Sequence, residues 1–273
     1  MINISLLSFL ILIFILTTSL VLTKTLTGSL EISALAIHKK FYQNSVKKIL
    51  NTRDNVKLPD FKKSNTIPKK IFQTHKSIDF IPKYYLDNLK KNNPGYEYIF
   101  HNNEEAREFL QEYYGEIFVN KFDSFKNGPH KADLWRLCVL YKFGGCYIDS
   151  DLEMKIPFDE IIDSNKNNLI IPVTVFPINF RRIFNALIIC KPCDELIGEC
   201  IKKIMLVEQK NLDYNYHFII HLMTNILKGK IENNLEEKHI PNGFNLYLSN
   251  TDNFYIKFKK SNKIVAKSKR IDY

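Results

Sequence analysis

The stretch "KADLWRLCVLYKFGGCYIDSDLE", residues 131 to 153, predicts a helix, a glycine stop and a short strand that ends in two aspartates. Its apolar residues recur at the i, i+3, i+4, i+7 spacing of a core-facing helix side, at positions 134, 137, 138 and 141. Gly144-Gly145 ends the helix, because glycine tolerates the left-handed conformation found at helix ends. The short strand "CYI" (146–148) then delivers Asp149 and Asp151 to its carboxyl end, where open α/β sheets bind ligands.

Asp149 and Asp151 place two repelling carboxylates one residue apart. In a strand they would point to the same side, so they would share a proton or hold a cation. A hard divalent ion, Mg²⁺ or Mn²⁺, would relieve the repulsion and leave coordination positions for phosphate oxygens. The pair therefore predicts a metal that acts as a Lewis acid on a departing diphosphate. The alternative is a solvated Asp-Ser-Asp turn without a function.

Asp133 and Arg136 lie three residues apart in the predicted helix and so share one face. They are either part of a binding site beside the aspartates or a surface ion pair worth a few tenths of a kcal/mol.

The residues before this stretch alternate between strand and helix patterns. We predict strands at "IPKKIFQTH" (67–75) and "YEYIF" (96–100), and helices at 81–95 and 102–114. The second helix begins at an Asn cap with Glu104 and Glu105 in its first turn. This order indicates an α/β fold with a mostly parallel, Rossmann-type sheet and flanking helices.

The N-terminus, from Ile2 to Thr23, carries no charge and has about the 20 residues needed to cross a bilayer as a helix. No basic residue precedes it, which favours an uncleaved anchor over a cleaved signal sequence. We therefore expect a transmembrane anchor at 1–23, a stem at 24–66 and one catalytic domain at 67–273. The nearby lysines all follow the span, which by the positive-inside rule would place the domain in the cytosol.

The remaining composition excludes several classes of protein. The chain has five cysteines, an odd number that cannot be fully paired in disulfides within the chain. Cys190 and Cys193 lack the second pair of ligands that a zinc site needs, so we interpret them as ordinary thiols. The net charge of +10 is concentrated partly in "KFKKSNKIVAKSKR" (257–270), which we interpret as a solvated run that could also lie against anionic lipid. No zinc-finger spacing or RNA-binding signature accompanies it, so no nucleic acid is expected.

Three motifs in order resemble a known family, the DXD sugar transferases of glycosyltransferase family 32. They are "IPKKIFQTH", "NPGYEYIFHN" and "ADLWRLCVLYKFGGCYIDSDLE", between residues 67 and 153. Members include initiating mannosyltransferases and α-1,4-glycosyltransferases. The resemblance implies a GT-A-like fold, a UDP- or GDP-linked sugar donor, Mn²⁺ or Mg²⁺, and retention at the anomeric carbon.

The resemblance also implies roles for residues of this chain. Asp149 and Asp151 would hold the metal, Asp149 would also approach the ribose, and Asp133 and Arg136 would contact the donor, with Arg136 in a catalytic role. Tyr147 would line the same pocket, and Gln73 and Thr74 would lie beside the nucleotide. The acceptor would be a glycan, glycolipid or glycoprotein, and the location a Golgi- or ER-type membrane with the domain in the lumen. That orientation conflicts with the positive-inside rule.

The second half of the chain departs from the family pattern. "YHFIIHLMTNIL" (216–227) lacks the Gly-Pro of many relatives, and the chain's only Trp is Trp135, so the late His and Trp ligands have no clear counterpart. We assign no role to His217, His221 or His239. Two other functions stay open: a non-catalytic membrane protein that binds sugar or nucleotide, and an Asp-x-Asp phosphotransferase. The phosphotransferase motif favours Thr or Val where this chain has Glu153.

Overall fold

A computed structural model describes residues 40, 42–162, 169–175, 181–230, 244–248, 253–258 and 264–269. The chain divides into two compact units, Met1–Lys48 and Ile49–Tyr273. Of the first unit, residues 40 and 42–48 are described, and they are helical. The predicted anchor at 1–23 lies outside the described residues. Within the part of the chain that is described, no helix is long and apolar enough to span a bilayer.

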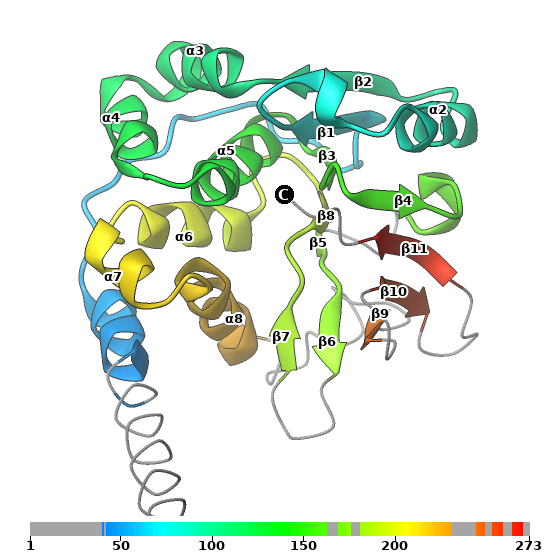
Figure 1. The fold of residues 1–273 in the computed structure, drawn as a ribbon. Helices are drawn as coiled ribbons and strands as arrows, with labels where there is room; N and C mark the ends of the chain where they lie inside the picture. Colours follow the sequence, from blue (N-terminus) through cyan, green and yellow to red (C-terminus); the bar gives the residue numbers. More distant parts are fainter. Residues whose placement is uncertain are drawn as a thin grey trace, which may run out of the picture. The chain divides into compact units, whose positions relative to one another are not determined.

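Two sheets and a set of helices build the second unit (Figure 1). The first sheet has the order β2-β1-β3-β8-β5, with bounds β1 (Lys70–Thr74), β2 (Glu97–His101), β3 (Gly145–Ile148), β5 (Leu169–Ile170) and β8 (Leu187–Cys190). The second has the order β4-β11-β10-β9-β6-β7, with bounds β4 (Leu152–Met154), β6 (Val173–Val175), β7 (Arg181–Ile183), β9 (Phe244–Leu248), β10 (Asn253–Phe258) and β11 (Ile264–Lys269). The helical elements are η1 (Ile78–Phe80), α2 (Lys83–Asn92), α3 (Asn103–Tyr114), α4 (Glu116–Ser124), α5 (Gly128–Phe143), η2 (Phe158–Glu160), α6 (Glu195–Ile204), α7 (Gln209–Tyr214) and α8 (Phe218–Lys230).

The α/β class is confirmed, but the expectation of a mostly parallel sheet holds only for part of it. Strand β1 pairs in parallel with β2 and with β3, whereas β8 runs antiparallel to both β3 and β5. In the second sheet the one parallel pairing among the described strands joins β6 and β9. The first sheet is therefore mixed, because the chain returns through β8 without a crossover helix.

The first three strands and their helices follow the local signals of the sequence. Asn102 caps α3 by accepting from the amides of Glu104 and Glu105, and Glu105 completes a capping box. Helix α5 begins at Gly128, with a proline in its first turn, and ends at Phe143 before Gly144. Helix α4 was not predicted from the sequence.

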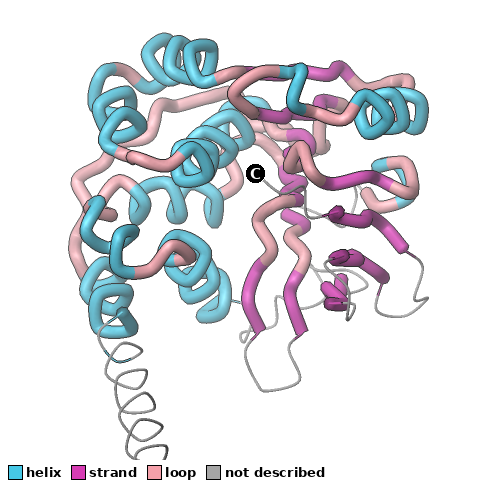
Figure 2. The backbone as a smooth tube through the Cα atoms, viewed as in Figure 1, coloured by secondary structure: helices cyan, strands magenta, loops and turns pink. Residues whose placement is uncertain are grey.

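Helices α3 to α6 lie on one side of the first sheet, and the second sheet lies on the other (Figures 1 and 2). Ile71, Cys146 and Ile148 of the first sheet share one buried cluster with Val265 and Ala266 of the second. This corrects the interpretation of residues 257–270 as a solvated run. Lys257 and Phe258 belong to β10 and 264–269 form β11, because Val265 and Ala266 supply apolar side chains to the core.

Candidate active site

The two aspartates lie in a turn that follows β3. The amide of Leu152 donates to the carbonyl oxygen of Asp149 at 3.1 Å, and Ser150 is buried between the aspartates. The two aspartates therefore lie in a turn after the strand and not within a strand. Strand β3 ends at Ile148, because the chain must turn there to enter β4 of the second sheet.

The Asp149 carboxylate is held from inside the protein. The Tyr147 hydroxyl donates to its Oδ1, and the Arg136 Nη1 lies 3.3 Å from the same oxygen. The side chain remains 31% exposed, so it faces the protein on one side and solvent on the other. Asp149 is thus oriented by buried partners while part of its carboxylate stays accessible.

Arg136 connects α5 to this turn from a buried position, at 4% exposure. It donates to the carbonyl oxygens of Ala132 at 3.2 Å and Asn185 at 2.7 Å, and its Nη2 lies 3.3 Å from Asp133 Oδ1. Burial alone would lower its pKa, but the charges of Asp149, Tyr147 and Asp133 outweigh burial and raise the pKa. Arg136 therefore remains charged.

Asp133 is buried on the same side of α5 and accepts from the Asn185 side-chain amide at 2.7 Å. Burial raises the pKa of this carboxyl, against the opposing charge of Arg136. The predicted pairing of Asp133 and Arg136 is confirmed, but as a buried pair and not a surface pair. Asn185 was missed in the sequence analysis, since no local pattern marks an asparagine that reaches a helix from a distant turn.

Gln73 and Thr74 end β1, the parallel neighbour of β3. The Gln73 side-chain amide donates to the Asp149 carbonyl oxygen at 3.3 Å, and its Oε1 accepts from the Tyr98 hydroxyl at 2.9 Å. Thr74 donates instead to the His101 carbonyl oxygen at 2.7 Å, which ties β1 to β2. Gln73 thus supports the aspartate turn from the neighbouring strand, while Thr74 is bound to strand β2.

Asp151 is half-buried at the far end of the turn. Burial raises the pKa of Tyr85 on α2, and the nearby carboxylates of Glu153 and Asp151 raise it further. Asp151 also contributes to the raised pKa of Arg136. These effects bring Asp151 within electrostatic reach of both α2 and Arg136, so the two aspartates belong to one charged site.

The carboxylates of Asp149 and Asp151 fit a hard divalent ion whose remaining coordination positions are filled by other ligands. Across the described ranges, no group of three or more His, Cys, Asp and Glu side chains could hold a metal by itself. A magnesium-type site commonly uses one or two carboxylates and takes its remaining ligands from phosphate and water. Asp149 and Asp151 supply that minimum.

Tyr216, between α7 and α8, lies within electrostatic reach of Asp133 and Asp149, and it was not singled out in the sequence analysis. Its ring lies 4.9 Å from the ring of buried His130, whose Nε2 is 2.9 Å from the Tyr216 carbonyl oxygen. Burial raises the Tyr216 pKa, and the charges of Asp133 and Asp149 raise it further. The side chain is nevertheless 51% exposed, so it presents an aromatic face beside the aspartates.

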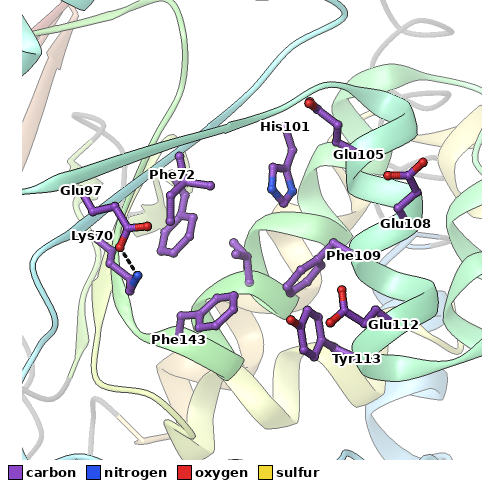
Figure 3. Close-up of a pocket in the computed structure, with 12 residues that line it drawn as sticks. Lys70, Phe72, Glu97, His101, Glu105, Glu108, Phe109, Glu112, Tyr113 and Phe143 are labelled. Atoms are coloured by element: carbon purple, nitrogen blue, oxygen red, sulfur yellow. Dashed lines mark hydrogen bonds and ion pairs between the residues drawn. The ribbon is translucent and has the colours of Figure 1, made fainter.

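A pocket of about 400 Å³ lies elsewhere, between β1, β2, α3 and α5 (Figure 3). Phe72, Phe109 and Phe143 contribute its aromatic lining, together with several glutamates on its wall. Phe72 and Gln73 are consecutive strand residues, so their side chains point to opposite faces of β1. Neither Asp149 nor Asp151 lines this pocket, which is separate from the candidate site.

The cysteines are free thiols. Cys190 is buried, and the half-buried Cys193 has its Sγ 3.3 Å from the Phe61 carbonyl oxygen.

Two yeast proteins are similar to part of this chain. "Inositol phosphoceramide mannosyltransferase 3" of Schizosaccharomyces pombe is 34% identical over 102 residues, which are 36% of this chain and 28% of that protein. "Mannosyl phosphorylinositol ceramide synthase SUR1" of Saccharomyces cerevisiae is 38% identical over 92 residues, 33% of this chain and 24% of that protein. The chain thus spans about a quarter of the length of these relatives.

Among solved structures, "PaToxG Glycosyltransferase" aligns with a TM-score of 0.41 at 14% identity and covers 79% of this chain and 90% of its own. Residues 79–168 match the family model described as "Glycosyltransferase sugar-binding region containing DXD motif". That range includes Asp133, Arg136, Tyr147, Asp149 and Asp151, whereas Gln73 and Thr74 precede it. The chain therefore carries, over residues 79–168, a glycosyltransferase sugar-binding region of the DXD type.

Proposed function

We propose that this chain is a membrane-anchored, metal-dependent glycosyltransferase that moves a hexose from a nucleotide sugar to a lipid acceptor. One observation carries the proposal. The DXD turn presents Asp149 and Asp151 at the carboxyl ends of the parallel strands β1 and β3, and buried Arg136 and Tyr147 fix the first carboxylate. Ligands of open α/β sheets bind at such an edge.

The metal role is assigned to Asp149 and Asp151, with Mn²⁺ or Mg²⁺ as the ion. When bound, the ion would neutralise negative charge on the departing nucleoside diphosphate. Arg136 and Tyr147 keep Asp149 oriented, and Gln73 holds its backbone carbonyl. A carboxylate fixed before the donor arrives needs no rearrangement during the reaction, which lowers the barrier.

The donor sugar is assigned to the space in front of Asp133, Arg136 and Tyr216. Asp133 is 7% exposed, so we assign it a hydrogen bond to a sugar hydroxyl through the carboxylate edge that reaches the surface. Tyr216, at 51% exposure, is assigned a packing contact between its ring and the sugar. In the transfer, the bond between the anomeric carbon and the diphosphate oxygen breaks. The diphosphate oxygen keeps the electron pair of that bond, the acceptor oxygen bonds to the anomeric carbon on the same face, which gives retention, and the acceptor proton passes to the departing diphosphate. Thr74 is assigned to the nucleotide end of the site, where β1 stops.

The sugar and acceptor follow from the names of the relatives. Both yeast proteins are named for mannose transfer to inositol phosphoceramide, so mannose and a sphingolipid acceptor are the first pair to test. The nucleotide is UDP or GDP. The uncharged segment from Ile2 to Thr23 supports a membrane location, which we assign to the lumenal side of a Golgi- or ER-type membrane.

The test measures release of nucleoside diphosphate from UDP- and GDP-sugars by the full-length protein with Mn²⁺, with and without inositol phosphoceramide. We expect turnover of one donor, and a loss of at least about 100-fold in Asp151→Asn, the scale seen when one group aimed at developing charge is removed. Asp123→Asn is the matched control, because Asp123 is an exposed carboxylate paired with Arg107 on α3.

Equal turnover in Asp151→Asn and the wild type would contradict the metal assignment. Donor binding by calorimetry without turnover, under every acceptor condition, would favour a sugar-binding protein instead.

A further inference from the structure

The segment from the end of β1 into the first turn of α2 exposes large apolar side chains. Phe80 is 63% exposed, Tyr84 64% and Ile78 39%. These are three of the six large hydrophobic residues that are exposed in the described part of the chain. Single exposed apolar residues are ordinary, but three within seven positions form a local concentration that marks an interaction surface. We call residues 76–84 the aromatic loop.

The aromatic loop is held in one conformation by its own contacts. Ser77 caps η1 by accepting from the Asp79 amide at 3.2 Å and donates to the Asp79 carboxylate at 2.9 Å. Ile81 is buried at 4% exposure. Beyond the loop, Asn88 of α2 donates to the Met154 carbonyl oxygen at 3.1 Å, which fastens α2 to β4. The outward side chains are therefore presented by an anchored backbone.

The aromatic loop lies at the same edge of the sheet as the DXD turn. It follows the carboxyl end of β1, and the DXD turn follows the carboxyl end of β3, the parallel neighbour of β1 (Figure 1). The side-chain amide of Asn88 on α2 lies 3.5 Å from the Glu153 carboxylate, two residues after Asp151, which places α2 beside the turn. A surface that contacts the loop would therefore meet the entrance of the candidate active site.

The chemistry of the loop matches an anionic lipid surface. The exposed Lys76 precedes Ile78 and Phe80, the exposed Lys83 directly precedes Tyr84, and the one acid of the loop, Asp79, is hydrogen-bonded to Ser77. Aromatic side chains favour the headgroup level of a bilayer, and each lysine near an anionic leaflet contributes attraction. We propose that the aromatic loop docks on the anionic lipid surface that carries the acceptor, with Phe80 and Tyr84 entering the headgroup region. The purpose of docking rests on the proposed function, but the docking itself does not.

The test places an environment-sensitive NBD fluorophore at Ile78→Cys, which leaves Phe80 and Tyr84 in place. The full-length protein is reconstituted in vesicles of phosphatidylcholine with phosphatidylserine. The background is Cys193→Ser, because the other four cysteines are buried. The control label is Ile117→Cys, because Ile117 is 72% exposed and belongs to α4, a helix that lies across the unit from α2 (Figure 1).

We expect a blue shift and quenching by nitroxide lipids at position 78 and neither at 117. Phe80→Ser with Tyr84→Ser should abolish both signals. Lys76→Gln and Lys83→Gln should each lower the ratio of inserted to water-exposed label by up to about fivefold.

Equal signals at 78 and 117 would overturn the proposal, as would a blue shift at 78 that nitroxide lipids do not quench, because such a probe would be buried against protein and not in lipid. Insensitivity to both lysine changes would overturn the assignment to anionic lipid. Donor hydrolysis measured in detergent tests the proposed function separately. If hydrolysis fails while position 78 still inserts into lipid, the proposed function is contradicted and the docking proposal stands.

Discussion

Tyr216 shows how the fold can bring a residue near a site that its local sequence does not mark. The stretch "YHFIIHLMTNIL" offers no site pattern, yet the fold brings the exposed Tyr216 ring against His130 and near the carboxylates of Asp133 and Asp149. Its position beside the donor site suits an aromatic wall for a sugar ring. Such a contact depends on the ring and not on the hydroxyl.

We therefore expect Tyr216→Ala to raise KM for the donor up to about tenfold, the effect of losing about 1.4 kcal/mol of contact, with a smaller change in kcat. Tyr216→Phe keeps the ring and should stay near the wild type. Steady-state kinetics on both variants checks this, and an unchanged KM in Tyr216→Ala would remove Tyr216 from the site.

At the scale of elements, the junction between α5 and β3 positions most of the site. Gly144 and Gly145 have φ values of +64° and +105°, which residues with a side chain rarely adopt. A Cβ on Gly145 would lie 2.7 Å from the Lys70 carbonyl oxygen of β1. The junction thus allows β1 and β3 to approach, and it sets Arg136 of α5 over the Tyr147 ring at 4.4 Å.

Gly145→Ala is accordingly expected to lower the free energy of unfolding by at least about 2 kcal/mol, through backbone strain and separation of β1 from β3. Gly128→Ala is the control, since a Cβ there meets nothing within 4 Å and φ is not positive. That change should alter stability by less than about 1 kcal/mol. Urea unfolding in detergent measures both, and equal stability of the two variants would show that the junction tolerates a side chain.

At the scale of the whole molecule, two half-buried histidines, His75 and His101, couple stability to pH. The His101 ring lies 5.3 Å from the Trp135 ring and 5.9 Å from the Phe109 ring, and its Nδ1 has no hydrogen-bond partner in the described part of the structure. Burial lowers the His101 pKa below its ordinary value of 6.5, although Glu105 and Glu108 oppose this. Burial likewise lowers the His75 pKa.

Since the folded protein disfavours the charged imidazole, the unfolded chain binds protons first as pH falls below 6.5. Stability should therefore decrease from pH 6.5 down to the folded pKa. His101→Phe removes one titrating group, so its unfolding midpoint should change less with pH than that of the wild type. Urea midpoints above and below pH 6.5 test this, and parallel pH profiles would contradict it.

The sequence by itself determined the elements whose signals are local. The Asn102 capping box, the proline at the start of α5 and the Gly144-Gly145 stop act within a few residues, so they can be recognised without the fold. The pair Asp133 and Arg136, one helical turn apart, and the pair Asp149 and Asp151 were predictable for the same reason. The DXD sugar-transferase resemblance also rests on residues adjacent in the chain.

Only the tertiary structure decided what depends on distant residues. Arg136 reaches the Asn185 carbonyl oxygen 49 positions away, and Gln73 reaches the Asp149 carbonyl oxygen 76 positions away. The packing of the two sheets against each other likewise decides three further features. They are the antiparallel direction of β8, the turn at residues 149–151 and the burial of Val265 and Ala266 in β11. No local propensity encodes these contacts, because their energies come from packing and burial that exist only after the chain has closed on itself.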